Sequence, residues 1–146
     1  MFQQIIATAP TWINLPLRLA LGLIFIGNGS QKVFGVWGGK GLNEFMAGAP
    51  PLGLRPAWLW MGAAAFSEFI GGVLVLLGFL TRLGALMIVP VMLVAIIGVL
   101  WGGGFFLPKG FEYAFALLCI ALALVIAGGG RLSVDEKLMR SRGRRR

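Results

Sequence analysis

The stretch AWLWMGAAAFSEFIGGVLVLLGFL, residues Ala57–Leu80, decides the fold class of this chain of 146 residues. It contains a single charged side chain, Glu68, among apolar and small residues. A helix needs about 20 mostly apolar residues to cross the roughly 30 Å hydrocarbon core of a bilayer. The stretch meets that length, so the sequence predicts a membrane-spanning helix here.

Three more apolar stretches of similar length lie around it, at Leu15–Phe34, Leu83–Trp101 and Phe111–Ala127. Hydrophobic residues make up 58% of the chain and charged residues only 12%, whereas a soluble domain has about 25% charged residues. We therefore predict an all-α fold: a four-transmembrane-helix antiparallel bundle over residues 1–130, followed by a basic tail over residues 131–146.

The segments between these stretches predict further structure. Thr81–Arg82 alone separates the second and third stretches, which predicts a tight antiparallel hairpin, and Pro90 predicts a kink in the third helix. The connection Gly35–Pro56 is too apolar for a solvated linker. We expect it to fold back over the outer mouth of the bundle, with Leu42–Met46 as a short helical turn. Ser133–Glu136 matches a capping box and predicts a helix in the tail.

The basic residues predict an orientation. Seven of them lie from Arg131 onward, and Arg18 and Arg82 bring the number on that side of a four-span bundle to nine. The other side carries Lys32, Lys40, Arg55 and Lys109. The positive-inside rule then places both termini in the cytoplasm and the protein in the plasma (inner) membrane. Beside so much apolar sequence, the basic tail indicates anionic lipid rather than nucleic acid. Its candidate lipid-binding residues are Arg142, Arg144, Arg145 and Arg146.

Glu68 requires an explanation, because a charge at the centre of a bilayer costs about 2.5–3.5 kcal/mol on insertion scales. It lies about eleven residues into its helix, or about 16 Å at 1.5 Å per residue, near the midplane. Its neighbours one turn away are Ala64, Ala65, Gly71 and Gly72. Small residues permit close approach of another helix or a small polar cavity. Both a structural ion pair and a functional role remain open at this point.

Other polar residues accompany Glu68 toward the outer side. Lys32 lies four residues after Asn28 on the first helix, and taken alone it is explained by snorkelling to the interface. Glu112 opens the fourth helix at a similar depth. The candidate ligand-binding set is Asn28, Gln31, Lys32, Glu68 and Glu112. If these side chains converge, they form a site that holds the polar head of a ligand, or that holds and passes a proton.

Several classes of chemistry are disfavoured. The chain has no histidine, the commonest metal ligand and general base, and its single cysteine excludes both an intrachain disulfide and dithiol chemistry. We assign no catalytic residue, no metal site and no covalent cofactor, so an enzyme acting alone is the least favoured interpretation. Cys119 is expected to be a buried structural thiol, and Arg18 is expected to snorkel to lipid phosphate.

Four short motifs, in order and at suitable spacings, resemble those of the DoxX family of small four-helix membrane proteins. They are Arg18–Phe25 with Gly29 and Lys32, Ser67–Gly72 with Leu76–Arg82, Gly104–Phe106 with Gly110–Tyr113, and Gly128–Gly130 before Leu132–Asp135. The resemblance covers about residues 15–138. One departure is that many members carry a polar residue or histidine before Gly-Phe-Phe, where this chain has Trp101 and glycines. A catalytic base is therefore not expected there.

The resemblance implies a link to redox metabolism. Family members accompany quinone-reducing thiosulfate oxidation or act as membrane partners of sulfur-transfer and superoxide-detoxifying enzymes, and similar four-helix proteins bind quinones or sterols. The leading hypothesis is a noncatalytic subunit that binds a quinone-like or other lipophilic ligand and docks a soluble redox partner. The alternatives are a small transporter or proton-relay protein, and a purely structural or assembly protein. The ligand, the partner and any homo-oligomer are left open by the sequence.

Overall fold

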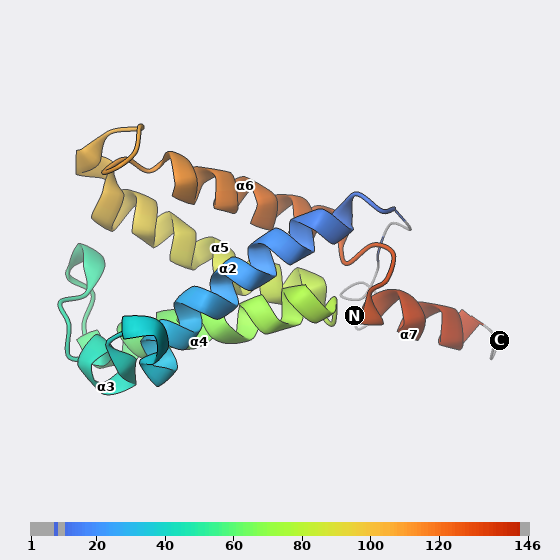
Figure 1. Cartoon of the computed structure of the whole chain (residues 1–146), viewed down its shortest axis with the longest axis horizontal. Coiled ribbons are helices and arrows are strands. Elements are labelled where there is room, and N and C mark those ends of the chain that lie inside the picture. Colours follow the sequence, from blue (N-terminus) through green and yellow to red (C-terminus); the bar gives the residue numbers. More distant parts are fainter. Residues whose placement is uncertain (1–7, 9–10, 144–146) are drawn as a thin grey trace.

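The computed structural model describes residues 8 and 11–143, and every regular element in that part of the chain is a helix (Figure 1). The α-helices are α2 (Asn14–Phe34), α3 (Gly41–Met46), α4 (Ala57–Leu77), α5 (Thr81–Ala95), α6 (Glu112–Ala127) and α7 (Val134–Gly143). The 3-10 helices η1 (Val36–Gly38) and η2 (Pro51–Gly53) lie between α2 and α4, while α5 continues as a π-helix, η3 (Ile96–Leu100), and a 3-10 turn, η4 (Trp101–Gly103). The predicted all-α fold is confirmed.

Two helices are long and apolar enough to cross a membrane. They are α4 and the continuous helix Thr81–Gly103, and α2 with the segment Val36–Gly53, bent by 101°, gives a third candidate span. Helix α6 is apolar but has 16 residues, so it rises about 24 Å. The chain is therefore a membrane protein with two or three candidate spans, and the fourth crossing remains a prediction.

Helices α2 and α4 approach each other closely because glycines line their contact. A Cβ added to Gly22 would lie 2.8 Å from the Cβ of Leu76, and one added to Gly29 would lie 2.6 Å from the backbone of Phe69. From the other side, a Cβ on Gly72 would lie 2.8 Å from the backbone nitrogen of Ile26. In lipid, helices associate through such close packing rather than through the hydrophobic effect. Any side chain at Gly22 or Gly29 would push the pair apart.

The interior of the bundle is apolar, and so is most of its outside. Fully buried side chains from four helices form the core: Leu21, Phe25, Val75, Ile88, Ala121 and Leu124. The outward face of α6 carries Phe115, Cys119 and Leu122, all exposed. The expectation of a buried thiol was therefore wrong. Because lipid solvates this face, a weakly polar thiol needs no buried position.

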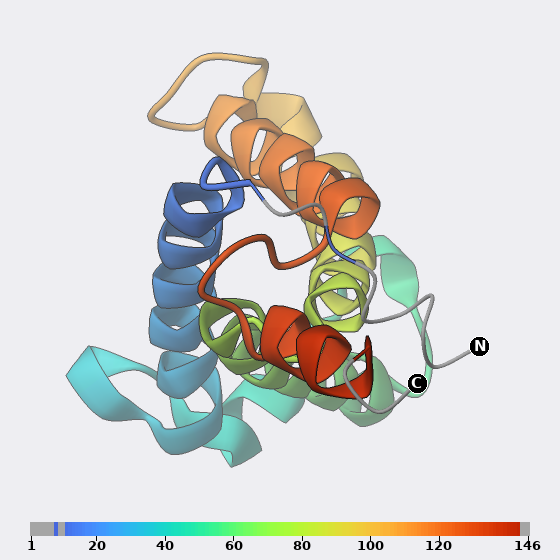
Figure 2. The ribbon, with the colours of Figure 1, turned by 90° about the vertical axis from the view of Figure 1, so that its right-hand side faces the viewer.

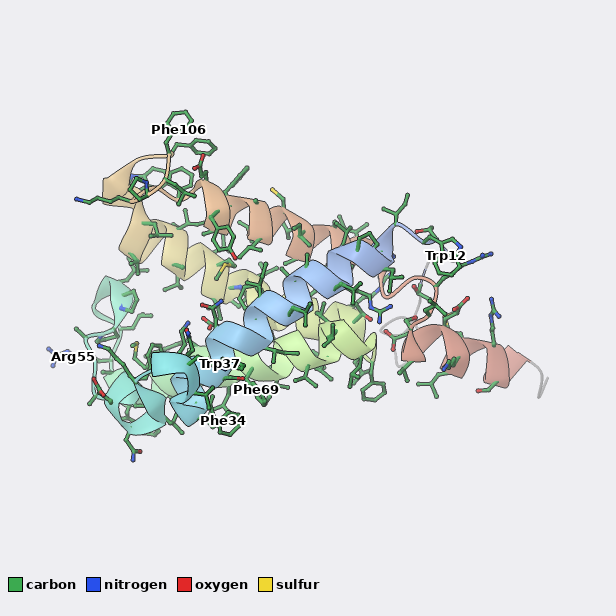
Figure 3. All side chains as sticks on the ribbon, in the orientation of Figure 1. Trp12, Phe34, Trp37, Arg55, Phe69 and Phe106 are labelled. Atoms are coloured by element: carbon green, nitrogen blue, oxygen red, sulfur yellow. The ribbon has the colours of Figure 1, made fainter. Side chains whose placement is uncertain are left out.

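Aromatic side chains mark both ends of the bundle. Trp12 lies at the end where α2 begins, and Trp37 and Phe106 lie at the opposite end (Figure 3). All three are more than half exposed. Tryptophan and other aromatic rings favour the two membrane–water interfaces, so this distribution supports a bundle that crosses the bilayer.

The loop over residues 35–56 folds back across the end of the bundle, as predicted. Its short helix was expected at Leu42–Met46 and is α3, which packs against both α2 and α4. Farther along, η2 packs against η3, since a Cβ on Gly98 would lie 2.9 Å from the Cβ of Pro51. The loop thus connects the α2–α4 side of the bundle with η3, the C-terminal extension of α5.

The hairpin between α4 and α5 turns three residues earlier than predicted. Thr81 and Arg82 belong to α5, and the turn is Gly78–Leu80. Gly78 ends α4 in the left-handed conformation (φ 68°), and the N–H of Phe79 donates to the carbonyl of Leu74 at 3.0 Å. This is a Schellman ending, in which glycine is favoured. Helix α5 continues past Pro90, and the change of helix type comes only at η3.

The predicted orientation can be tested by labelling two exposed residues at opposite ends, Lys40 and Ser141. In a Cys119→Ala background, an impermeant thiol reagent added to intact cells should modify the Lys40→Cys protein and leave the Ser141→Cys protein unmodified. Permeabilised cells, in which both proteins should react, provide the control. Modification of only the Ser141→Cys protein in intact cells would reverse the orientation.

Candidate functional site

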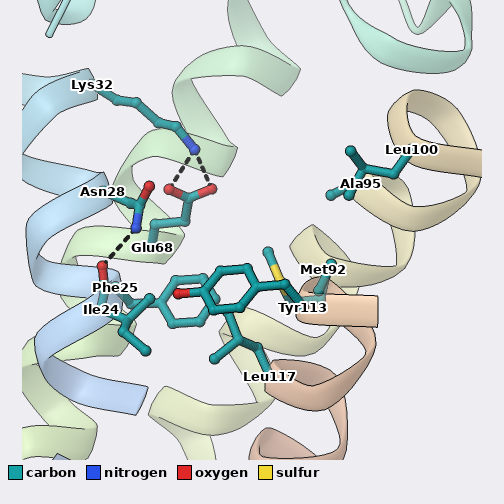
Figure 4. A pocket seen from close by; sticks show the side chains of 11 residues that line it. Ile24, Phe25, Asn28, Lys32, Glu68, Met92, Ala95, Leu100, Tyr113 and Leu117 are labelled. Carbon is teal, nitrogen blue, oxygen red and sulfur yellow. Dashed lines mark hydrogen bonds and ion pairs between the residues drawn. The ribbon is translucent and has the colours of Figure 1, made fainter. Parts of the chain in front are cut away.

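A cavity of about 170 Å³ lies among α2, α4, α5 and α6. Its walls are mostly apolar, with four polar side chains: Asn28, Lys32, Glu68 and Tyr113 (Figure 4). The apolar lining residues are Ile24, Phe25, Met92, Ala95, Leu100, Ala114 and Leu117. We call this cavity the bundle pocket.

The strongest interaction in the bundle pocket is an ion pair between α2 and α4. The Lys32 Nζ lies 2.5 Å from both carboxylate oxygens of Glu68 (Figure 4). The Glu68 side chain is 3% exposed and that of Lys32 is 28% exposed. The ammonium also lies 5.3 Å from the ring centroid of Phe45 in α3, a cation–π distance. Lys32 therefore points inward to Glu68, and snorkelling is not its role.

Helix packing explains how this pair forms. Lys32 follows Gly29 by three residues, so both lie on one face of α2. The close approach at Gly29 brings in the backbone of Phe69, the residue after Glu68. Ala65, one turn before Glu68, is also buried and adds little bulk to the contact. The small residues around Glu68 thus provide both of the features expected of them, close helix contact and a cavity.

The predicted set converges only in part. Gln31 lies outside the bundle pocket, with its Nε2 at 3.5 Å from the carbonyl of Trp37. Glu112 accepts a hydrogen bond from the N–H of Leu107 at 2.8 Å, within the α5–α6 loop. Asn28 lines the pocket, and its Nδ2 donates to the carbonyl of Ile24 at 2.9 Å. The residues brought together are Asn28, Lys32 and Glu68.

The sequence reasoning missed Tyr113, the only tyrosine in the chain. Its side chain reaches from α6 across the bundle pocket toward α2 (Figure 4). One residue along a helix rotates the side chain by about 100°, so Tyr113 faces the pocket where Glu112 does not. The helical periodicity of α6 could have identified Tyr113, because it shares one face of the helix with the pocket residues Ala114 and Leu117.

A second polar cluster lies at the opposite end of the bundle, and Arg18 is its centre. Arg18 is 3% exposed, so the expectation that it snorkels to lipid was wrong. Its guanidinium donates to the carbonyls of Val75 at 3.0 Å and Leu76 at 2.9 Å, in the last turn of α4, and to that of Gly129 at 3.1 Å. The helix end offers carbonyls without helical partners, and a cation is favoured there.

Asp135 performs the complementary task at the start of α5. Its two carboxylate oxygens accept the N–H of Leu80 at 2.8 Å and the N–H of Thr81 at 2.9 Å, and the Thr81 hydroxyl donates to it as well. Free N–H groups at a helix start favour an acceptor with negative charge. One cation and one anion thus cap the two helix ends of a single hairpin. We call Arg18, Gly78, Thr81, Ser133 and Asp135 the inner lock, after the side of the membrane on which the predicted orientation places them.

The predicted tail helix is present as α7. Ser133 accepts the N–H of Glu136 at 3.1 Å through its hydroxyl, which confirms the first half of the capping box. The Glu136 carboxylate accepts the N–H of Leu132 at 3.2 Å, one residue before the expected donor. The Arg142 side chain and residues Arg144, Arg145 and Arg146 lie outside the described part of the chain. The lipid-binding assignment thus stays a prediction.

Comparisons with known proteins give one match. Searches of curated proteins and of solved structures found nothing significantly similar. The DoxX family model matches residues 13–101, more than half of the chain. The matched segment contains Arg18, Lys32, Glu68 and the whole α4–α5 hairpin, so it includes the ion pair and much of the inner lock. This chain belongs to the DoxX family.

Proposed function

We propose that the protein is a noncatalytic DoxX-family membrane subunit that binds a quinone-like or other single-ring lipophilic molecule and docks a soluble redox partner. One observation carries the ligand-binding proposal: the ion pair between Lys32 and the buried Glu68 borders a mostly apolar pocket. Intramembrane charges of this kind are costly and commonly mark ligand or ion sites.

The size of the bundle pocket favours a small ring. Its volume of about 170 Å³ is close to the roughly 150 Å³ of an engineered apolar cavity that binds benzene. Pockets for drug-sized ligands measure about 300–1,000 Å³. One six-membered ring therefore fits, and any long apolar tail has to leave the pocket between helices and continue into lipid.

The polar groups favour a ring that carries hydrogen-bond acceptors. Lys32 supplies an ammonium donor from α2, which Glu68 holds at the pocket. Tyr113 supplies a hydroxyl from α6 on the other side. A quinone carries carbonyl acceptors on opposite sides of one ring, and Phe25 and Met92 provide apolar contacts for its faces. The shared chemistry is a neutral ring with two opposed acceptors.

A proton pathway across the bundle has less support. Between the depth of Glu68 and that of Arg18, the fully buried side chains are apolar, including Leu21, Val75 and Ile88. Among the described residues, no charged side chain lies in the core between these two depths. A relay requires successive groups that exchange a proton, whereas ligand binding requires only the outer half of the bundle.

Filling the bundle pocket should release the ligand. Ala95 lines the pocket, and Ala116 lies on the exposed face of α6. Protein purified in mild detergent should retain a ring-bearing lipophile that mass spectrometry detects. The Ala95→Phe variant should retain at least about tenfold less, equivalent to about 1.4 kcal/mol, and the matched Ala116→Phe variant should retain it fully. Equal retention by both variants, or no such molecule in the unmodified protein, would reject the proposal.

A further inference from the structure

Helix α7 is held firmly at its start and packs along no other helix that the structure describes. It lies beyond the end of the bundle rather than against its side (Figures 1 and 2). Its anchor is the inner lock. Asp135 accepts two hydrogen bonds from Thr81 of α5 and one from Leu80 of the preceding turn, and its own N–H donates to the carbonyl of Gly78 at 2.9 Å. Ser133, which caps α7, is fully buried and donates to the carbonyl of Gly130 at 2.6 Å.

The segment before α7 is also held in place by hydrogen bonds. Arg18 holds the segment before α7 through the carbonyls of Gly129, Arg131 and Leu132 at 3.1–3.4 Å. A helix of 10 residues is marginally stable on its own in water, where about 12–15 are needed. The inner lock fixes its first turn and so presents the remainder of α7 at a defined place beyond the bundle.

The sequence of α7 and of the residues that follow it is strongly basic. From Glu136 to Arg146 the sequence carries six basic residues and one acidic residue. Lys137 and Arg140 are exposed on α7, and Arg140 is paired with Glu136 at 2.7 Å. Met139 is exposed beside them. A helix with exposed cations and an exposed apolar side chain is complementary to an acidic surface with an apolar patch.

We propose that α7 is a docking element for the acidic surface of a soluble protein. Helix α7 would be the surface through which the proposed soluble partner docks. This proposal rests on the partner-docking part of the proposed function. It does not depend on the ligand, because the bundle pocket lies in the other half of the bundle. An amphipathic helix that binds lipid lies in the plane of the interface. Helix α7 instead continues past the end of the bundle (Figure 1), which favours a partner in the aqueous phase over the membrane surface.

The experiment begins with a photo-crosslinking amino acid at Met139 of the full-length protein in native membranes. The expected adduct contains a soluble protein, which mass spectrometry identifies and which is then purified. It should bind the protein in phosphatidylcholine nanodiscs with an affinity that falls with salt. The variant Lys137→Glu with Arg140→Glu should weaken binding at least about tenfold, whereas the matched variant Lys40→Glu with Lys109→Glu, at the opposite end, should not change it.

Other results would overturn the inference. They are adducts with lipid only, no adduct, or a partner whose binding ignores the charge reversal on α7. Adding phosphatidylglycerol to the nanodiscs should not protect the crosslinker at Met139 from a water-soluble quencher, and protection would assign α7 to the membrane. The Ala95→Phe variant separates the two proposals, because it should lose the lipophile and still bind the partner.

Discussion

Replacing Arg18 by methionine should destabilise the folded bundle by about 3–5 kcal/mol, the usual cost of removing one partner from a buried charged network. Methionine fills a similar volume but cannot donate. The carbonyls of Val75 and Leu76 then lose their partner at the end of α4, and that of Gly129 loses it in the segment before α7. A buried acceptor without a partner costs about 1–3 kcal/mol. Equilibrium unfolding in detergent micelles measures the loss.

Two more variants show whether geometry or charge matters. Arg18→Lys keeps the charge, but a single ammonium cannot reach carbonyls on both α4 and the segment before α7. It should lose more than half as much stability as Arg18→Met. Arg131 lies at the same end, exposed, with its guanidinium 5.6 Å from the ring centroid of Trp12. The control Arg131→Met should cost no more than about 1 kcal/mol. Similar losses for Arg18→Met and Arg131→Met would contradict the inner lock.

The helices were predictable from the sequence because apolar runs have a physical minimum length in a bilayer. The start of α4 at Ala57 and the end of α6 at Ala127 match the predicted bounds. The turn at Gly78–Leu80 was misplaced because hydrophobicity does not distinguish a left-handed glycine from helical residues. The glycine between Leu77 and Phe79 was the available signal, since such a residue commonly ends a helix.

The inner lock was not predictable from local sequence, because its partners are far apart along the chain. Arg18 is separated from Gly129 by 111 positions, and Asp135 from Thr81 by 54. Snorkelling is the default for an arginine near a helix end only when no protein carbonyls are available. Arg18 and Gly78, which lie in the segment that matches the family, meet Asp135 at this one place and hold the ends of α4 and α5 together.

Glu68 was predictable because a carboxylate near the middle of an apolar helix has few explanations, and all of them place it in the interior. Its partner was open among several residues. The partner is set by the position of each residue around the axis of α2. Lys32 lies on the face that Gly29 brings against α4, whereas Gln31, one residue earlier, points in another direction. Glu112 likewise points away from the bundle pocket, and Tyr113, the next residue along α6, lines the pocket instead.

Breaking the ion pair from its two ends should have unequal effects. The Lys32→Met variant leaves the Glu68 carboxylate, 3% exposed, without its cation, and should lose about 3–5 kcal/mol of stability. The Glu68→Gln variant leaves Lys32, 28% exposed, which can turn to the interface. Its stability should change by less than about 1 kcal/mol. The double variant should resemble Glu68→Gln, and the same detergent unfolding measurement completes the cycle.

The same variants separate a structural pair from a ligand site. Glutamine in place of Glu68 keeps the shape of the side chain but cannot hold the Lys32 ammonium by charge, so the donor for the ligand is no longer fixed at the bundle pocket. The folded Glu68→Gln protein should therefore lose the copurified lipophile at least about tenfold, equivalent to about 1.4 kcal/mol. Glu112→Gln is the matched control, because that carboxylate binds the α5–α6 loop and lies outside the pocket. It should retain the molecule. A stable Glu68→Gln protein that retains the lipophile fully would show that the ion pair only fixes α2 against α4. If the charge of Glu68 were required for binding, its removal would have reduced the retained amount.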